Sequence, residues 1–231
     1  MVNRDRDTVL ANLATVRAGI ERACVLAGRD PSGVRIVAAG KTVEPEALRW
    51  VREGGVEDFG ENYVQELRAK REAMTDATWH FIGTLQSHTA HHVAELAAVV
   101  ETLAPGKAWG RLARRAVERG RTLRALIEVD FSGGRTGVPP EDVAGFADEV
   151  ARVEGLELVG LMTLPPLPET AEDARPYFRR LRALLAEVAE RHPEARELSM
   201  GMSLDYGVAV EEGATMIRIG TALFGERPPN G

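Results

Sequence analysis

Residues 34–41, Val-Arg-Ile-Val-Ala-Ala-Gly-Lys, are the first of eight short apolar runs that alternate along the chain with longer amphipathic segments. Short apolar runs bounded by turn residues are typical of buried strands, and apolar residues spaced three and four apart are typical of helices. Eight strands, each followed by a helix, is the count of a TIM (β/α)8 barrel, which we therefore predict. A doubly wound open sheet shares this alternation, usually with fewer strands.

The predicted elements cover nearly the whole chain. We expect strands at residues 34–41, 56–61, 78–83, 97–103, 123–130, 156–163, 197–203 and 215–220. We expect helices at residues 3–28, 44–54, 62–74, 87–95, 107–119, 140–153, 173–191 and 204–212, with a short one after residue 220. The proline-rich segment 164–168 is predicted to be a loop after the sixth strand, so residues 1–231 are expected to form a single domain.

The composition is typical of a globular protein in a reducing compartment. Apolar residues make up 44% of the chain, and the net charge of −6 argues against non-specific nucleic-acid binding. No apolar stretch approaches the roughly 20 residues that cross a bilayer, and residues 1–10 are charged where a signal peptide is apolar. One cysteine, Cys24, excludes an internal disulfide. We expect a cytoplasmic protein without nucleic-acid or membrane partners.

Lys41 is the first candidate for chemistry, because this chain otherwise uses arginine almost exclusively for positive charge. Of its 29 basic residues only Lys41, Lys70 and Lys107 are lysines. An amine can lose its proton and attack a carbonyl, whereas a guanidinium cannot. At the C-terminal end of the first predicted strand, Lys41 would lie at the barrel mouth, where barrel enzymes place their functional residues.

The last two predicted strands carry a candidate phosphate site. Residues 201–205 (Gly-Met-Ser-Leu-Asp) and 218–221 (Arg-Ile-Gly-Thr) offer backbone amides and hydroxyls, although both are also ordinary helix-start sequences. Barrel enzymes frequently bind phosphate at this position. Strand alternation places Lys41, Ser203 and Arg218 on faces that look into the barrel. An amine, a phosphate site and a group facing a ring nitrogen are what pyridoxal phosphate (PLP) requires.

Several sequence blocks resemble the YggS/PROSC family of pyridoxal phosphate homeostasis proteins. The blocks are Ala39–Thr42, Phe59–Glu66, Trp79–Gly83, Leu161–Met162, Ser199–Ser203 and Arg218–Gly225. They follow the family's order over essentially the whole chain. The resemblance implies the fold of the N-terminal domain of alanine racemase, a TIM barrel with an extra N-terminal helix.

The same resemblance implies a site. Lys41 would carry PLP as a covalent internal aldimine, Arg218 would face the pyridine nitrogen, and Asn62 would lie near the ring. The phosphate would be held by Ser203, Gly220 and Thr221. The expected partners are PLP itself and, transiently, the apo forms of PLP-dependent enzymes, and the chain is expected to act as a monomer.

We expect a PLP carrier in intracellular PLP homeostasis rather than an enzyme, and no catalytic residue is assigned. Racemisation needs acid–base groups on both faces of the cofactor. In alanine racemases, as the resemblance implies, the opposing tyrosine comes from a second domain, which we do not expect in a chain that ends at Gly231. A cation at residue 218 would also weaken the carbanion sink. The alternatives are a PLP-dependent amino-acid racemase, another Schiff-base barrel enzyme such as a cofactor-free aldolase, and a pure interaction protein.

Three candidate residues also have structural interpretations. Arg218 could pair with a barrel carboxylate such as Glu61. Asn62 could cap a helix that begins at Tyr63. His80 alternates with large aromatic residues and is expected to be a hydrogen-bonded histidine inside the barrel.

The segment after residue 86 departs from the family pattern. The family commonly continues Ser-Asn-Lys, whereas this chain has Ser87-His88-Thr89. His88, His91 and His92 include a pair spaced four residues apart that could bind a metal. We expect no acidic or cysteine partner to be positioned near these histidines, and therefore no metal.

Overall fold

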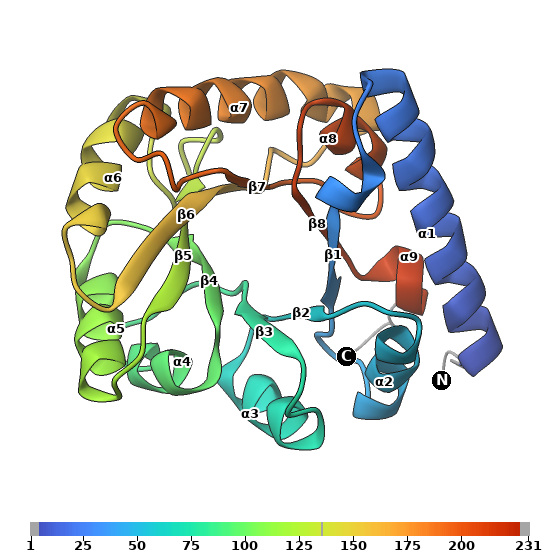
Figure 1. The fold of residues 1–231 in the computed structure, drawn as a ribbon, viewed down its shortest axis with the longest axis horizontal. Helices are drawn as coiled ribbons and strands as arrows, with labels where there is room; N and C mark the ends of the chain where they lie inside the picture. Colours follow the sequence, from blue (N-terminus) through green and yellow to red (C-terminus); the bar gives the residue numbers. More distant parts are fainter. Residues whose placement is uncertain (1–4, 135, 227–231) are drawn as a thin grey trace.

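The structure is a computed structural model that describes residues 5–134 and 136–226, and its strands close into a parallel barrel in chain order (Figure 1). The strands are β1 Arg35–Ala39, β2 Asp58–Glu61, β3 Thr78–Phe81, β4 Val99–Leu103, β5 Leu123–Val129, β6 Leu156–Thr163, β7 Glu197–Ser199 and β8 Met216–Ile219. The last strand pairs with the first, from Arg35 opposite Met216 to Ala38 opposite Ile219. The predicted TIM barrel is confirmed, and the open sheet is excluded.

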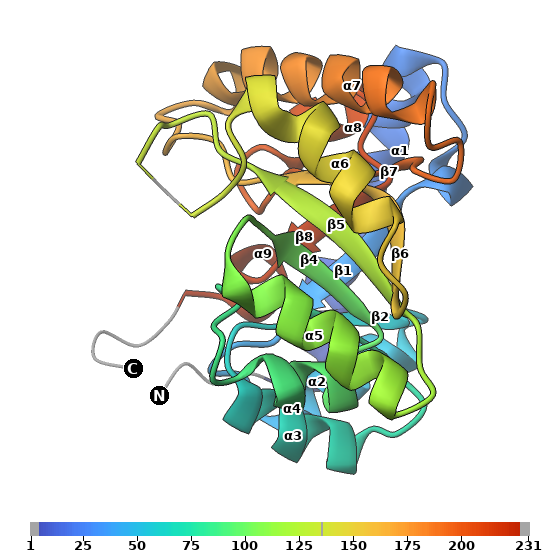
Figure 2. The ribbon, with the colours of Figure 1, turned by 90° about the vertical axis from the view of Figure 1, so that its left-hand side faces the viewer.

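Helices cover the outside of this barrel (Figures 1 and 2). They are α1 Arg6–Ala27, α2 Pro45–Glu53, α3 Val64–Ala73, α4 Ala90–Leu96, α5 Lys107–Glu118, α6 Val143–Ala151, α7 Arg175–Ala189, α8 Tyr206–Glu211 and α9 Thr221–Phe224. Two predicted helices begin with 3-10 turns, Pro140–Asp142 before α6 and Ala171–Ala174 before α7. Among the described residues, no helix is long and apolar enough to span a membrane.

The N-terminal helix α1 is an addition to the barrel and packs along α2, α8 and α9 (Figure 1). Asp5 caps its start, accepting a hydrogen bond from the Thr8 amide at 2.9 Å, and Gly28 ends it in the left-handed region at φ 63°. Cys24 is a buried free thiol on this helix.

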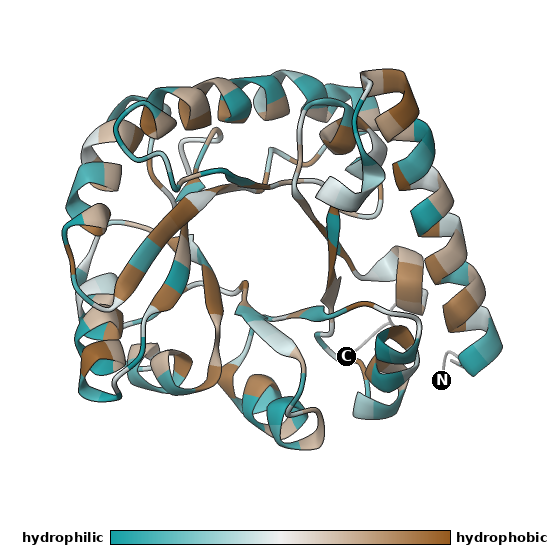
Figure 3. Ribbon diagram, viewed as in Figure 1, coloured by the Kyte–Doolittle hydropathy of each residue, from teal (hydrophilic) through white to brown (hydrophobic). Residues whose placement is uncertain are grey.

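The barrel wall separates two apolar regions. Strand residues that face outward, such as Ile217 and Ile219, join the large core beneath the helices. The helices alternate between hydrophobic and hydrophilic residues, as Figure 3 shows, which is typical of elements with one buried face. A smaller apolar cluster fills part of the interior and consists of Val37, Val99, Leu126, Val159, Met162 and Met216. Arg218 alternates with Ile217 and Ile219 in β8, so the prediction that Arg218 faces the barrel interior is confirmed.

Two strands end earlier than predicted, and this changes how their site residues are presented. β1 ends at Ala39, so Lys41 lies in the following turn rather than on the strand. β7 ends at Ser199, so Ser203 lies in the loop beyond it. Gly201 interrupts the strand with φ 92°, and a Cβ there would lie 2.5 Å from Cβ of Ala209. The prediction that strand alternation places Lys41 and Ser203 on inward faces was therefore wrong, because neither residue lies on a strand.

Candidate functional site

A cavity of about 280 Å³ opens at the C-terminal ends of the barrel strands. All six residues predicted to bind the cofactor line it: Lys41, Asn62, Ser203, Arg218, Gly220 and Thr221. They lie in or just after β1, β2, β7 and β8, and the first two of these strands are remote in the sequence from the last two. Closure of the barrel between β1 and β8 therefore assembles the site.

Lys41 sits on a tight turn between β1 and α2. The turn is closed by the Val43 amide, which donates to the carbonyl of Gly40 at 2.8 Å. Thr42 has φ 62°, a left-handed conformation that is rare for a β-branched residue. A Cβ on Gly40 would lie 2.6 Å from Oε1 of Glu61, so glycine lets the turn lie against the end of β2.

A buried cluster of charged side chains around Lys70 lies beneath this turn, and it was not predicted from the sequence. The Nζ atom of Lys70 lies 2.7 Å from each of three acceptors: Oε1 of Glu61, Oε2 of Glu66 and the carbonyl oxygen of Gly40. Burial raises the pKa of Glu61 to about 7, although Lys70 acts in the opposite direction. The spacing of residues 66 and 70 by one helical turn was the available signal, but it cannot show that α3 packs against the Lys41 turn.

The loops after β7 and β8 are joined on the other side of the cavity. The backbone amide of Ala222 donates to Oγ of Ser203 at 3.0 Å. Gly220 precedes α9 and accepts hydrogen bonds from the amides of Leu223 and Phe224 at 3.0 and 2.9 Å. With Oγ of Ser203 already accepting one bond, its hydroxyl hydrogen remains available to donate to an anion.

Arg218 lies in β8 with its side chain buried inside the barrel. Nη1 donates to Oγ of Ser199 at 2.6 Å, and Nη2 donates to the carbonyl oxygen of Thr163 at 2.8 Å. Nη1 also lies 3.8 Å from Oε2 of Glu101 in β4. The pairing of Arg218 with a barrel carboxylate is therefore confirmed, but Glu61 is not that carboxylate. Burial lowers the pKa of Arg218, and an arginine nevertheless stays charged at neutral pH.

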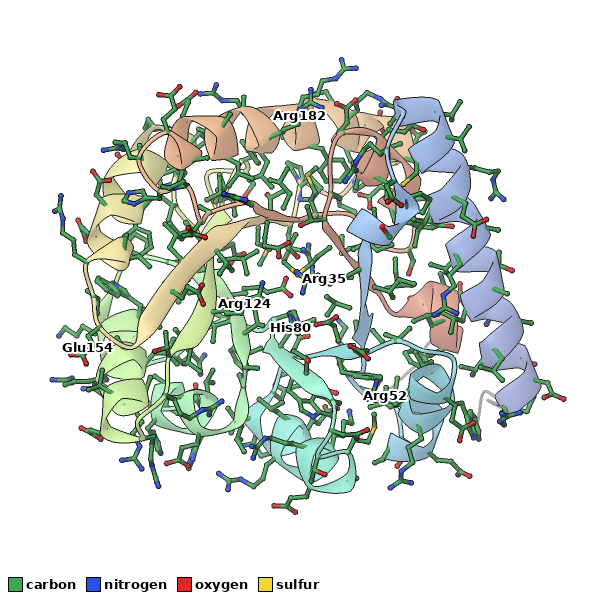
Figure 4. The ribbon with its side chains drawn as sticks, viewed as in Figure 1. Arg35, Arg52, His80, Arg124, Glu154 and Arg182 are labelled. Atoms are coloured by element: carbon green, nitrogen blue, oxygen red, sulfur yellow. The ribbon has the colours of Figure 1, made fainter. Side chains whose placement is uncertain are left out.

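A chain of buried polar groups continues from Arg218 down the barrel interior. Ser199 Oγ donates to Oε2 of Glu101 at 2.5 Å, while His80 contacts Glu101 at 2.7 Å and Asp58 at 2.8 Å. Figure 4 shows His80 toward the middle of the ring of strands. The expected hydrogen-bonded barrel histidine is confirmed, but its connection to Arg218 was not foreseen.

Within this buried network, His80 and the two carboxyls of Asp58 and Glu101 each stabilise the charged form of the other. Burial disfavours the charged ring of His80, but hydrogen bonds to Asp58 and Glu101 outweigh burial and raise the pKa of His80. Burial likewise opposes ionisation of both carboxyls, yet their bonds with His80 hold the pKa of each below its ordinary value. These shifts favour a protonated His80 ring between two carboxylates. The ring in turn stabilises Glu101 as an anion near Arg218.

Asn62 does not cap a helix, contrary to one interpretation of the sequence. α3 begins at Val64, and its N-cap residue is Tyr63, without a side-chain capping bond. Oδ1 of Asn62 is buried and has no hydrogen-bond partner among the described residues. A buried acceptor without a partner costs free energy, so a polar group entering the cavity would be stabilised there.

The histidines of α4 and its approach do not form a metal site in the part of the chain that the structure describes, where no group of three or more potential ligands occurs. His92 instead contacts Arg68 through Nδ1 at 3.0 Å. The carboxylate of Glu95 lies 4.0 Å from the same nitrogen, so the expectation that no acidic group is nearby was wrong. The ring of His92 also contacts that of His91, with centroids 3.8 Å apart and the ring planes tilted by 41°.

Comparison with known proteins identifies the family to which this protein belongs. Residues 10–228 match the protein-family model described as alanine racemase, N-terminal domain. The chain belongs to the pyridoxal phosphate homeostasis protein family: it is 40% identical over 220 residues to the member from Aquifex aeolicus, covering 93% of this chain and 96% of that protein. Identity to the member from Pseudomonas aeruginosa is 39% over 226 residues, covering 95% of this chain and 96% of the relative.

Solved structures agree with this family. PipY of Synechococcus elongatus with PLP bound has a TM-score of 0.83 and 33% identity, covering 94% of this chain and all of PipY. A protein from Bifidobacterium adolescentis has a TM-score of 0.89 and 30% identity, covering 95% of each chain. Alanine racemase of Clostridium difficile, at 14% identity and a TM-score of 0.76, shares the fold, with 97% of this chain and 58% of the racemase covered.

Proposed function

We propose that this protein binds PLP in the cavity at the barrel mouth, as a Schiff base on Lys41, and releases it in PLP homeostasis without sustained catalysis. The observation that carries the proposal is the convergence of all six expected binding residues on one cavity. The family membership and the PLP-bound structure of PipY support it.

The residues of the cavity fit the chemical groups of PLP. The Lys41 amine would condense with the aldehyde, forming a carbon–nitrogen double bond and releasing water. Ser203, Gly220 and Thr221 would bind the phosphate through hydroxyl and amide donors. Arg218, which is held rigidly by its contacts inside the barrel, would face the ring nitrogen as a hydrogen-bond donor. When bound, PLP supplies an electron-withdrawing ring, and a neighbouring cation weakens that capacity.

The acid–base groups of the cavity favour a carrier over a racemase. Among the described residues that line it, the ionisable side chains are Lys41 and Arg218. Racemisation needs a second acid–base group opposite the lysine, and a permanently charged arginine is a poor proton carrier. Tyr63, one of the tyrosines near a strand end, is 60% exposed and lines a neighbouring cavity instead.

The test is a trapping experiment on purified protein. After incubation with PLP, borohydride reduction is expected to add one reduced phosphopyridoxyl group to Lys41, and a visible absorbance band is expected before reduction. Lys41→Ala should abolish both signals. Lys107→Ala, which removes an exposed lysine on α5, is the matched control and should retain them. Unchanged mass at Lys41 in the wild-type protein would refute the proposal.

One observation favours the enzyme alternative and gives it a test. Glu128 lines a second cavity, of about 560 Å³, that also contacts Lys41. A carboxylate there is a candidate proton acceptor. If the protein turns over amino acids by racemisation or transamination, Glu128→Gln should abolish that turnover while the Lys41 adduct still forms. The carrier proposal expects no sustained turnover in either protein.

We further propose that the acceptors are apo PLP-dependent enzymes in the cytoplasm and that the chain acts as a monomer. The buried free thiol of Cys24 is compatible with a reducing compartment. Transfer is measured as the rate at which the PLP-loaded protein activates an apo enzyme. That rate should exceed the rate obtained with free PLP alone, supplied at the concentration that the loaded protein releases into solution.

A further inference from the structure

The peptide groups on either side of Lys41 are both held by side chains of α3. The carbonyl oxygen of Gly40 accepts a hydrogen bond from Nζ of Lys70 at 2.7 Å. The amide of Thr42 donates to Oε2 of Glu66 at 2.9 Å. The two holding side chains are themselves joined, because Nζ of Lys70 also donates to Glu66 Oε2 at 2.7 Å. The backbone of the candidate nucleophile is thus fixed from both sides by one connected pair.

Lys70 is suited to holding and unsuited to attack. Its residue is only 5% exposed, and its ammonium has three N–H donors for the three acceptors around it. All three donors are engaged, and Lys70 is not among the described residues that line the cavity, so its amine does not compete with that of Lys41. A planar guanidinium cannot direct donors to these three positions from one atom, which explains a lysine here in an arginine-rich chain.

The turn needs such support because its conformation is unfavourable. Thr42 has positive φ, and β-branched residues are strained in this region. Strained backbone persists where the surroundings determine it, and it clusters at functional sites. The bond from the Thr42 amide to Glu66 compensates for this strain. Without that bond, the turn would relax and the Lys41 side chain would leave its direction into the cavity.

We infer that Glu66 and Lys70 form a positioning clamp that holds the Lys41 turn in its strained conformation and thereby sets the rate of Schiff-base formation on Lys41. This inference rests on the proposed function. The clamp takes no part in bond making: the Lys41 amine attacks the aldehyde carbon, and the aldehyde oxygen leaves as water. Its contribution is to restrict Lys41 to orientations from which attack is productive.

Four variants test the clamp, with two readouts. Glu66→Ala removes the acceptor for Thr42, Glu66→Gln keeps an acceptor oxygen but removes the charge, and Lys70→Arg keeps the charge but changes the donor geometry. Glu72→Ala removes an exposed carboxylate from the same helix and is the matched control. The readouts are the rate of the borohydride-trapped PLP adduct and, without PLP, the rate at which a small anhydride acetylates Lys41, both followed by mass spectrometry.

We expect Glu66→Ala to slow adduct formation about tenfold, which is what the loss of one charge-assisted hydrogen bond amounts to. Glu66→Gln should lie between it and the wild-type protein, Lys70→Arg should resemble Glu66→Ala, and Glu72→Ala should match the wild type. The acetylation rate of Lys41 should change in the same order. Equilibrium unfolding in urea, measured on each variant, identifies any that does not fold.

The outcomes separate the clamp from the proposed function. Adduct and acetylation rates in folded Glu66→Ala and Lys70→Arg that equal those of Glu72→Ala would overturn the clamp, even if stability falls. Acetylation rates that change as expected, in a protein that forms no PLP adduct, would support the clamp and refute the proposed function. A purely structural role predicts lower stability with unchanged reactivity at Lys41.

Discussion

Glu101→Gln is expected to be the most informative single change in the barrel interior, because Glu101 joins the two buried cations. Its Oε2 accepts from Ser199 at 2.5 Å and its Oε1 contacts His80 at 2.7 Å, while Arg218 lies 3.8 Å away. Ser199 in turn accepts from Arg218 and has only its own hydrogen to offer Glu101. Both oxygens of Glu101 are therefore required as acceptors.

An amide cannot replace this carboxylate, although it has nearly the same shape. One of its two ends is an NH₂ group, which would face a donor at either Ser199 or His80. Removing one partner of a buried charge pair costs about 3–5 kcal/mol. The amide oxygen keeps one of the two hydrogen bonds, so we expect the lower end, a loss of about 3 kcal/mol in the free energy of unfolding.

The assay is equilibrium unfolding in urea at pH 7, comparing the wild-type protein with Glu101→Gln at unchanged m-value. Glu157→Gln is the matched control, since Glu157 is an exposed residue of strand β6, and a change within about 0.5 kcal/mol is expected. Weaker PLP binding by Glu101→Gln should accompany the loss, because Arg218 loses its anchor. A destabilisation below about 1 kcal/mol would refute the view that Glu101 holds the buried cations.

Two further changes test the site by geometry and by titration. Gly83→Ala should destabilise the protein and weaken PLP binding, because a Cβ there would lie 2.1 Å from the backbone oxygen of Asn62. Gly110→Ala is the control, since a Cβ at Gly110 would have no atom within 4 Å, and it should leave both properties unchanged. Urea unfolding and PLP-binding assays measure the two effects. Burial raises the pKa of Glu61 from 4.5 to about 7, so the folded protein binds more protons than the unfolded chain between these values. Stability should therefore fall as pH rises through this window, by about 3 kcal/mol from this group, and Glu61→Gln should remove that slope in urea titrations at several pH values. An unchanged slope in Glu61→Gln would show that Lys70 already holds Glu61 ionised in the folded protein.

The sequence alone predicted the architecture and six of the residues that line the cavity. Strand and helix periodicity is local, so eight apolar runs and their intervening amphipathic segments could be recognised without any contact information. In a parallel barrel the C-terminal ends of all strands lie at the same mouth. The predicted fold therefore placed Lys41, Ser203 and Arg218 together there. The phosphate argument from the last two strands already included Gly220 and Thr221, and the resemblance to the family added Asn62.

Only the tertiary structure decided how these residues are held. Whether Lys41 ends a strand or sits on a strained turn depends on α3, which packs beneath it and supplies Glu66 and Lys70. The carboxylate near Arg218 is Glu101, whereas Glu61 pairs with Lys70. Which carboxylate lies near Arg218 depends on how the strands are aligned across the closed barrel. Hydrogen bonds and buried charges are properties of side chains that meet in space, and residues distant in the sequence show no local pattern that marks such meetings.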